Sequence, residues 1–365
     1  MNVKRIGVLL FSAAMACHGA PENVALKKPY TLSPAPRYRF CTDPADKVQL
    51  TDGVYAKGYF WTQKETVGWS GAAPVICTID LGKVEPVCGV SWSTAAGVAG
   101  VVWPQSLQVL VSEDKKSWTY LGDLCELGTE TQAPPAEKYA TFRYATDRMK
   151  GRGRYVCVIA AMQPYCFVDE IEAWRGSDEW LQGEMPGRRT DDPKNFYTES
   201  CMRSGVAARL RDDLRAIQEQ AKSLGQAAVA AELNVKAGEL TGKIPDEAEN
   251  VASACVQTVL PFDGLHKTIL ALNAPVLRAA GVTEPLVWQN NRWDPLALMA
   301  VPPQDRRAGV DRIALDLMRG EVRGETFNIT NPQDADFVLE MTVGGIPYAV
   351  NLEVREVLFT DTLSR

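Results

Sequence analysis

Histidine is scarce in this chain, which has only His18 and His266 among its 365 residues. His18 lies beside the expected cleavage site of a leader, so His266 is the single histidine of the mature chain. A Ser-His-Asp or Cys-His enzyme would depend on that one residue, and a metal centre built from several histidines is excluded. Blocks of basic residues are missing too, and the net charge is −6. We therefore expect no nucleic-acid partner.

Long apolar runs are also missing, and the longest at the start of the chain has the features of a signal peptide over residues 1–16. Lys4 and Arg5 precede the apolar run 6–15, and Ala14-Met15-Ala16 is an A-x-A cleavage site. The run is too short to span a bilayer, which takes about 20 residues, so we expect no integral membrane segment after cleavage. The chain is predicted to be secreted, periplasmic or at the cell surface. A lipoprotein anchored through Cys17 is an alternative, although the usual Leu three positions earlier is missing.

Residues 21–176 have the pattern of a β-rich domain. In 75–81, Val75, Cys77, Ile79 and Leu81 alternate with other residues, which places them on one face of a strand. Several short strands separated by turns indicate a β-sandwich. The further strands are predicted at 89–93, 106–112, 118–121, 139–144, 154–160 and 168–174.

The residue pattern changes twice in the rest of the chain. A polar linker is predicted at 177–197, and a helical segment follows at 198–280, where Val206, Leu210 and Leu214 begin a series at three- and four-residue steps. Alternation returns in 285–365, with strands predicted at 312–317, 325–330, 335–343 and 351–360. The last region is predicted to be a small Ig-like β-sandwich, or a truncated one. The chain is therefore predicted to be multidomain and mainly β.

Cysteine is the next informative residue type. Eight of the nine lie beyond Cys17, none in a CxxC pair, so a zinc site is not expected. In an exported protein an even number favours disulfides, although eight cysteines allow 105 full pairings. We expect at least one disulfide within 21–176, with a Cys201–Cys255 bond as a weaker expectation. For Cys77, a buried free thiol is the competing outcome.

Six short motifs in residues 23–176 resemble the discoidin domain, also called the coagulation factor five/eight type C domain. They are N-V-A-L-K-K-P-Y at 23–30, D-G at 52–53 followed by Trp61, I-D-L-G-K at 79–83, the P…V-L-V-S-E-D…W stretch at 104–118, G-R-Y-V at 153–156 and D-E-I-E at 169–172. Each motif is weak alone, but their common order is specific. The region is also similar to the family 32 carbohydrate-binding modules.

The resemblance implies an eight-stranded, galactose-binding-like jelly roll with one structural Ca²⁺. Asp52 and Glu170 would supply carboxylates, and main-chain oxygens would come from Gln49, Val54 and Asp169. Ca²⁺ is a hard cation that takes six to eight oxygens, which suits such loops. This chain departs from the family, because seven residues separate Gly53 from Trp61 and a commonly ligating Thr is missing. The alternative is that Asp52 only caps a turn and Glu170 is hydrogen-bonded at a strand end.

The same resemblance implies a carbohydrate ligand, which needs an apolar platform and polar groups for its hydroxyls. Tyr38 and Tyr59 belong to the aromatic residues expected on loops, whereas Trp61 and Trp118 are expected in the core. For Trp69, exposure and burial are both open. Arg37 and Arg39 are candidate donors to sugar hydroxyls, with ordinary solvated charges as the alternative. The predicted carbohydrate-binding residues are Trp69, Trp92, Trp103, Tyr165, Phe167, Arg37 and Arg39.

The predicted function is glycan or polysaccharide binding by a secreted, non-catalytic accessory protein. A glycosidase needs two carboxylates across a cleft, but the acidic pairs at 169–170, 191–192 and 212–213 are better explained by the calcium site, the linker and a helix surface. No Gly-rich phosphate loop or GxSxG motif is present. Two alternatives stay open: an accessory fragment of a larger secreted glycoside hydrolase or polysaccharide lyase, and an adhesion or structural protein that binds protein partners.

Overall fold

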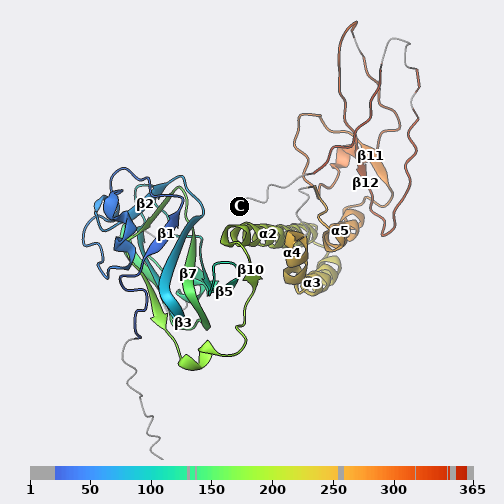
Figure 1. Ribbon diagram of the computed structural model, residues 1–365. Helices are drawn as coiled ribbons and strands as arrows, with labels where there is room; N and C mark the ends of the chain where they lie inside the picture. The colour runs from blue at the N-terminus through green and yellow to red at the C-terminus, as the bar shows by residue number, and fades with distance from the viewer. Residues whose placement is uncertain are drawn as a thin grey trace, which may run out of the picture. The chain divides into compact units, whose positions relative to one another are not determined.

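The computed structural model describes residues 21–129, 132–135, 138–253, 259–316, 318–342, 344–345 and 351–359 (Figure 1). The chain divides between Tyr197 and Thr198 into two compact units, which we call the first and the second unit. Each is described by itself. The predicted signal peptide and Cys17 lie outside the described residues.

The first unit consists of antiparallel sheet. Its main path has six strands in the order β1 (Tyr30–Ser33), β3 (Val75–Ala96), β7 (Gly151–Ala161), β4 (Ser106–Ser112), β5 (Trp118–Asp123) and β10 (Arg189–Thr190). Two more strands, β6 (Ala140–Thr146) and β9 (Ile171–Arg175), also pair with β3. A separate two-stranded sheet joins β2 (Val67–Ser70) to β8 (Tyr165–Val168).

The long strand β3 belongs to both layers of the sandwich. Its first half pairs with β1 and β7, its register shifts between Asp80 and Glu85, and its second half pairs with β9 and β6. Ile79 from the first half and Trp92 from the second lie in one buried cluster. The predicted alternation of residues 75–81 is confirmed, because all four apolar side chains on that face are buried. The fold is therefore a β-sandwich whose core lies between the two halves of β3.

Residues 177–197, predicted as a linker, fold as part of the first unit. Strand β10 pairs with β5, and Phe196 is buried with its ring centroid 5.1 Å from that of Tyr120. The remaining short elements of the chain are η1 (Pro44–Lys47), η2 (Gln49–Thr51), η3 (Phe60–Thr62), α1 (Leu124–Leu127), η4 (Asp178–Leu181) and η5 (Gln304–Arg306).

The predicted helical segment is present. It contains α2 (Pro193–Ser223), which begins in the first unit, and α3 (Ala227–Thr241), α4 (Ile244–Ser253), α5 (Gly264–Ala271) and α6 (Asn273–Ala279). Pro193 suits the first turn of α2, and the preceding Asp192 accepts the Lys194 N–H at 2.8 Å. The apolar face of α2 at Val206, Leu210 and Leu214 is buried as predicted. None of the helices among the described residues combines the length and the hydropathy that a membrane crossing requires.

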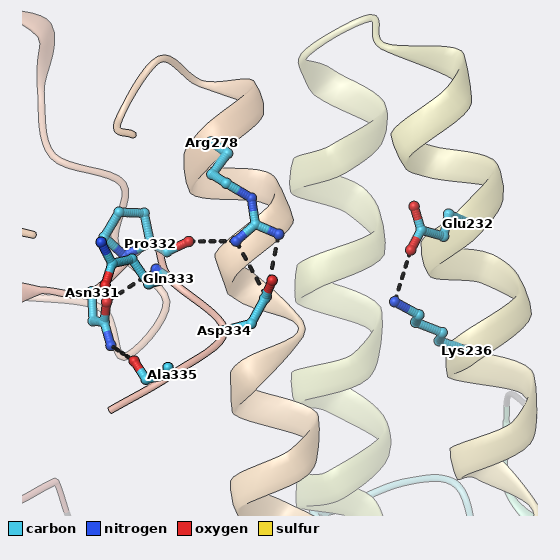
Figure 2. A network of polar contacts seen from close by, with 8 residues as sticks. All are labelled: Glu232, Lys236, Arg278, Asn331, Pro332, Gln333, Asp334 and Ala335. Atoms are coloured by element: carbon cyan, nitrogen blue, oxygen red, sulfur yellow. Dashed lines mark hydrogen bonds and ion pairs between the residues drawn. The ribbon is translucent and has the colours of Figure 1, made fainter. Parts of the chain in front are cut away.

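Figure 2 shows how α6 holds a loop of the second unit. Both terminal nitrogens of Arg278 lie 3.2 Å from Oδ1 of Asp334, and one also donates to the carbonyl oxygen of Pro332. Within the loop, Asn331 donates to the carbonyl oxygen of Ala335 and accepts the Gln333 N–H. On α3, Glu232 and Lys236 form a separate ion pair at the surface.

The Ig-like β-sandwich predicted for residues 285–365 is not confirmed. The described residues of this region contain one sheet of two short strands, β11 (Leu286–Trp288) and β12 (Asn328–Thr330). No strand forms in the described parts of 312–317, 335–343 or 351–360, and Val338 there is 96% exposed. A strand needs a neighbour for its backbone hydrogen bonds and a layer to cover its apolar face. In 351–359 one backbone hydrogen bond forms, from the Leu260 N–H to the carbonyl oxygen of Phe359 at 2.9 Å, but the described residues of these segments form no strand ladder.

Candidate functional site

Four aromatic side chains form an accessible surface on the loops of the first unit. We call Tyr38, Phe40, Tyr59 and Tyr165 the aromatic surface. Phe40 is 56% exposed and Tyr59 is 44% exposed, whereas Tyr38 and Tyr165 are half-buried. Three come from the segments that follow β1 and precede η3, and Tyr165 begins β8.

These rings rest on buried aromatic rings. The centroid of Tyr38 lies 4.8 Å from that of Phe167, and Phe167 lies 5.6 Å from Trp61. Tyr59 in turn lies 4.7 Å from Trp61, and Tyr38 lies 5.8 Å from Tyr165. Most of these contacts are edge-to-face, the geometry that the ring quadrupoles favour. The exposed rings are thus held by a continuous series of ring contacts.

The backbone under this surface is also fixed. The amides of Arg37 and Tyr38 both donate to the carbonyl oxygen of Gly68 in β2, each at 3.0 Å. A Cβ on Gly68 would lie 2.7 Å from Sγ of Cys41 and 2.8 Å from the Phe167 ring, so only glycine allows this packing. The Tyr139 hydroxyl accepts the Phe60 N–H at 3.0 Å and donates to the carbonyl oxygen of Gly58 at 3.1 Å. These contacts fix the loop that carries Tyr59.

Two of the predicted arginines flank Tyr38. Nε and one terminal nitrogen of Arg37 donate to the carbonyl oxygens of Ser70 and Gly71, both at 2.9 Å. The guanidinium of Arg39 lies 4.4 Å from the centroid of the Phe40 ring, a cation–π contact. Burial raises the pKa of Tyr38, so its hydroxyl stays protonated and able to donate a hydrogen bond.

The other predicted aromatic residues do not join this surface. Trp69, Trp92 and Phe167 are fully buried, so they cannot form a sugar platform. Trp69 also donates its Nε1–H to the carbonyl oxygen of Pro34. Trp69 in β2 and Trp92 in β3 lie in the main core. Phe167 in β8 lies in a second cluster with Phe60 and Trp61, which we call the aromatic cluster. Trp103 is half-buried against Phe142 and bonded to the carbonyl oxygen of Pro135.

Sequence reasoning missed Phe40, the most exposed ring of the aromatic surface. A signal for it exists in the segment R-Y-R-F at 37–40, where two aromatics alternate with arginines outside any strand. The segment lies beside β2 through the two bonds to Gly68, but Phe40 itself stays exposed. Aromatic residues in it are better candidates for a surface role than Trp69 or Trp92, which lie within strands.

The carboxylates of the predicted calcium site do come together. Oε2 of Glu170 accepts the Gly53 N–H at 3.2 Å, and Oδ2 of Asp169 accepts the Ala56 N–H at 2.8 Å. Asp52 accepts the Val54 N–H at 2.8 Å, which closes the turn where Gly53 adopts a positive φ of 83°. Both Asp169 and Glu170 are buried. The loop after η2 is therefore tied to the segment between β8 and β9.

The electrostatics of this site suit a cation. Burial raises the pKa of Glu170 to about 8, and the nearby carboxylates of Asp52 and Asp169 add to the rise. Oε1 of Glu170 and Oδ1 of Asp169 are buried without a hydrogen-bond partner among the described residues. In the described part of the chain no three His, Cys, Asp or Glu side chains form a metal-binding group by themselves. Main-chain oxygens, such as those predicted at Gln49 and Val54, would have to complete the ligand set.

The cysteines do not form the predicted disulfide. The six in the sandwich are all free thiols, and so is Cys201, whereas Cys255 lies outside the described residues. The buried cysteines belong to three different clusters of apolar side chains. Cys77 and Cys166 lie in the main core and Cys41 lies in the aromatic cluster. Cys157 lies in a third cluster with Trp118 and Phe196. Burial raises the pKa of Cys41 and Cys157 to about 12, so these thiols are unreactive.

His266 has a partner that sequence spacing could not show. Its Nε2 lies 2.9 Å from Oδ2 of Asp213, and its Nδ1 accepts the Phe262 N–H at 3.1 Å. Arg209 donates to the same Asp213 oxygen at 2.8 Å. His266 is fully buried and Asp213 is buried too, not on a helix surface as predicted. This arrangement links α2 to α5 and gives no substrate access to either group.

No family model matches this chain, and no curated protein matches it. Among solved structures, a chitosan-binding module from a Paenibacillus chitosanase/glucanase is 18% identical over 42% of this chain and 99% of its own, with a TM-score of 0.27. A fucolectin from striped bass serum is 15% identical over 43% and 50%, with a TM-score of 0.31. A Streptococcus pneumoniae fucose-binding module is 15% identical over 43% and 96%, with a TM-score of 0.27.

These neighbours are discoidin-like β-sandwich domains. The predicted resemblance of the N-terminal region to that class is therefore matched among solved structures, over about 42% of the chain. At these identities and TM-scores, the matches do not indicate which ligand this chain binds. The remainder of the chain is not explained by them.

Proposed function

We propose that this chain binds a glycan through the aromatic surface, with Arg37 and Arg39 as polar partners. The observation that carries the proposal is the pair of exposed rings, Phe40 and Tyr59. Tyr59 packs on the buried ring of Trp61, and Phe40 packs on Tyr38, which in turn contacts the buried ring of Phe167. The C–H face of a pyranose packs on such rings. Because the rings are already held in place, binding costs little side-chain entropy.

The experiment is a glycan array on the full chain, followed by calorimetric titration of the best ligand. A single site of this kind should bind with a Kd of about 0.1–1 mM. Phe40→Ala removes a ring that is not part of the core, so the fold should persist while affinity falls about tenfold. Trp293→Ala is the matched control, because Trp293 is an 81% exposed ring in the second unit. Unchanged binding by both Phe40→Ala and Tyr38→Ala would move the site elsewhere.

Calcium is proposed as a structural ion of the first unit. Asp52 and Glu170 would be its carboxylate ligands, and main-chain oxygens of Gln49, Val54 and Asp169 would complete the shell. The support is the pair of buried carboxylate oxygens without partners at Asp169 and Glu170, together with the raised pKa of Glu170. An ion there stabilises the folded state by mass action.

Removal of the ion should therefore lower the melting temperature of the first unit and weaken glycan binding only as a consequence. Thermal melts with EGTA and with added Ca²⁺ measure this, and Asp52→Ala should abolish the difference between them. Asp178→Ala is a control, because Asp178 pairs with Arg175 away from the three carboxylates. A melting curve that does not respond to chelator in the wild-type chain would remove the calcium claim.

We further propose a secreted, non-catalytic accessory role. The buried Asp213–His266 pair supports the non-catalytic part of this proposal, because His266 is used inside the helical unit. Incubation with a panel of polysaccharides, followed by assays for reducing ends and unsaturated products, tests this role. Turnover that Asp213→Asn or a single-carboxylate variant removes would favour the alternative of a hydrolase or lyase.

A further inference from the structure

Arg37 and Arg39 differ from most sheet arginines of the first unit in what they contact. Arg143 pairs with Glu172, Arg152 with Glu113, Arg154 with Asp80 and Arg175 with Glu85. Within the described residues, neither Arg37 nor Arg39 forms an ion pair with a carboxylate. Two guanidinium groups without a carboxylate partner thus belong to the segment that carries Tyr38 and Phe40, one at the carbonyl oxygens of Ser70 and Gly71 and the other over the Phe40 ring.

The side chain of Arg37 is held in place by hydrogen bonds that use only some of its N–H donors. Its contacts with the carbonyl oxygens of Ser70 and Gly71 use Nε and one terminal nitrogen. A guanidinium has five N–H donors, so the other terminal nitrogen keeps donors for a ligand. The backbone bonds of Arg37 and Tyr38 to Gly68 fix the position from which these donors point.

The wider surroundings of the aromatic surface are also basic. Lys57 lies two positions before Tyr59, and Lys138 directly precedes Tyr139, whose ring lies 5.1 Å from Tyr59. In the segment that follows Phe40, Asp43 caps η1 through the Ala45 N–H and Asp46 is buried. Burial raises the pKa of Asp46 to about 6. The segments of the aromatic surface thus carry cationic side chains in a chain whose net charge is −6.

We propose that the glycan bound here is acidic, a pyranose that carries a carboxylate or a sulfate ester. Its ring would pack on the aromatic surface while its anionic group takes the free edges of Arg37 and Arg39. Arginine suits both anions, because its planar fork matches their oxygen geometry and the hydrogen bonds are charge-assisted. This inference rests on the proposed function and adds the class of sugar to it.

The test uses the full chain and two matched pairs of ligands. One pair is oligogalacturonate and its methyl ester, and the other is a sulfated galactan oligosaccharide and its desulfated form. At low salt we expect the anionic member of at least one pair to bind about tenfold tighter than its neutral partner. That advantage should shrink as salt is added. The pair that shows it separates carboxylate from sulfate.

Variants assign the effect to the two arginines. Arg37→Ala and Arg39→Ala should each remove most of the anionic advantage, because each should weaken binding of the anionic member much more than binding of the neutral member. Arg39→Lys should restore part of it, because it returns the charge without the fork. Arg189→Ala is the matched control, since Arg189 is an exposed arginine in β10 of the same unit. The control should bind as the wild-type chain does.

The outcomes separate this inference from the proposed function. Equal affinity for the anionic and neutral members, with binding still lost in Phe40→Ala, overturns the acidic ligand and keeps the glycan site. An anionic advantage that survives both alanine substitutions overturns the role of the arginines. Absence of binding to all four probes overturns the acidic ligand, and a blank glycan array then also removes the proposed function.

Discussion

The two units differ in how they treat their apolar side chains. The first unit encloses them between sheet layers, and its main cluster draws buried residues from β2, β3, β4, β6, β7, β8 and β9. The helices of the second unit also bury their apolar side chains, which pack against one another in one cluster. The C-terminal segments of this unit, by contrast, leave Val322, Val338 and Val357 exposed. Alternating apolar residues therefore become a stable strand only where other strands complete the sheet and another layer covers it.

Within each unit, the backbone segments pack at different distances from one another. In the first unit a Cβ on Gly89 of β3 would lie 1.9 Å from the carbonyl oxygen of Thr146 in β6, whereas Gly238 in α3 has nothing within 4 Å. Strand-to-strand contact leaves no room for side chains at such points. A helix surface leaves more room for an added side chain. The first unit should therefore be less tolerant of substitutions that add a methyl group.

The largest expected effect follows from this difference. Gly89→Ala should destabilise the first unit by about 3–5 kcal/mol, because backbone must move to accommodate the new methyl group. Seven of the nine tryptophans lie in residues 61–180. Tryptophan fluorescence during urea unfolding therefore reports mainly on the first unit, and far-UV circular dichroism reports on the helices of the second.

The matched control for this experiment is Gly238→Ala. It fills open space in the last turn of α3 and should stabilise the second unit by about 0.5–1 kcal/mol. The fluorescence transition of Gly89→Ala should move to lower urea while the helical transition stays in place. Equal shifts of both transitions would mean that the two units unfold together, against the division at Tyr197.

The second prediction concerns the buried Asp213 of the helical unit. Burial acts to raise the pKa of Asp213, but hydrogen bonds from His266 and Arg209 outweigh it and hold the pKa below its usual range. Asp213→Asn leaves these two buried donors with a weaker, neutral acceptor. We expect a loss of about 2–3 kcal/mol in the unfolding free energy of the second unit.

The sign of the pH dependence follows from the lowered pKa. Asp213 contributes stability above its unfolded pKa, with a model-compound value of 3.8, and that contribution is lost as the pH falls through the lower folded pKa. The helical transition of the wild-type chain should therefore weaken below about pH 4, and Asp213→Asn should reduce this acid dependence. Asp212→Asn is the control, since Asp212 pairs with Arg215 near the surface. Acid profiles that are identical in wild type and Asp213→Asn would contradict the role of the carboxylate.

Much of the sandwich could be predicted from the sequence, because alternation of period two fixes which residues share a face. The strand predicted at 106–112 has the same bounds as β4. Alternation does not tell whether the second face is covered as well. For this reason Phe167 was expected on a loop but is buried, and the sequence left the burial of Trp69 open. Contacts between residues far apart, such as Arg37 with Ser70 or Asp213 with His266, leave no periodic signal at all.

The smallest expected effect compares the two polar contacts of Figure 2 within the second unit. The Glu232–Lys236 pair on α3 is exposed on both sides and joins residues of one helix. Lys236→Ala should give no measurable change in melting temperature, because such a pair is screened by water and salt. Arg278 instead connects α6 to a loop that is far away in sequence, through Asp334 and the carbonyl oxygen of Pro332. Arg278→Ala should leave the helical transition nearly in place but speed amide hydrogen exchange in residues 331–335, above all at the Gln333 N–H that Asn331 accepts. Exchange followed by mass spectrometry measures this, and equal exchange of the loop in both variants would show that Arg278 does not hold it.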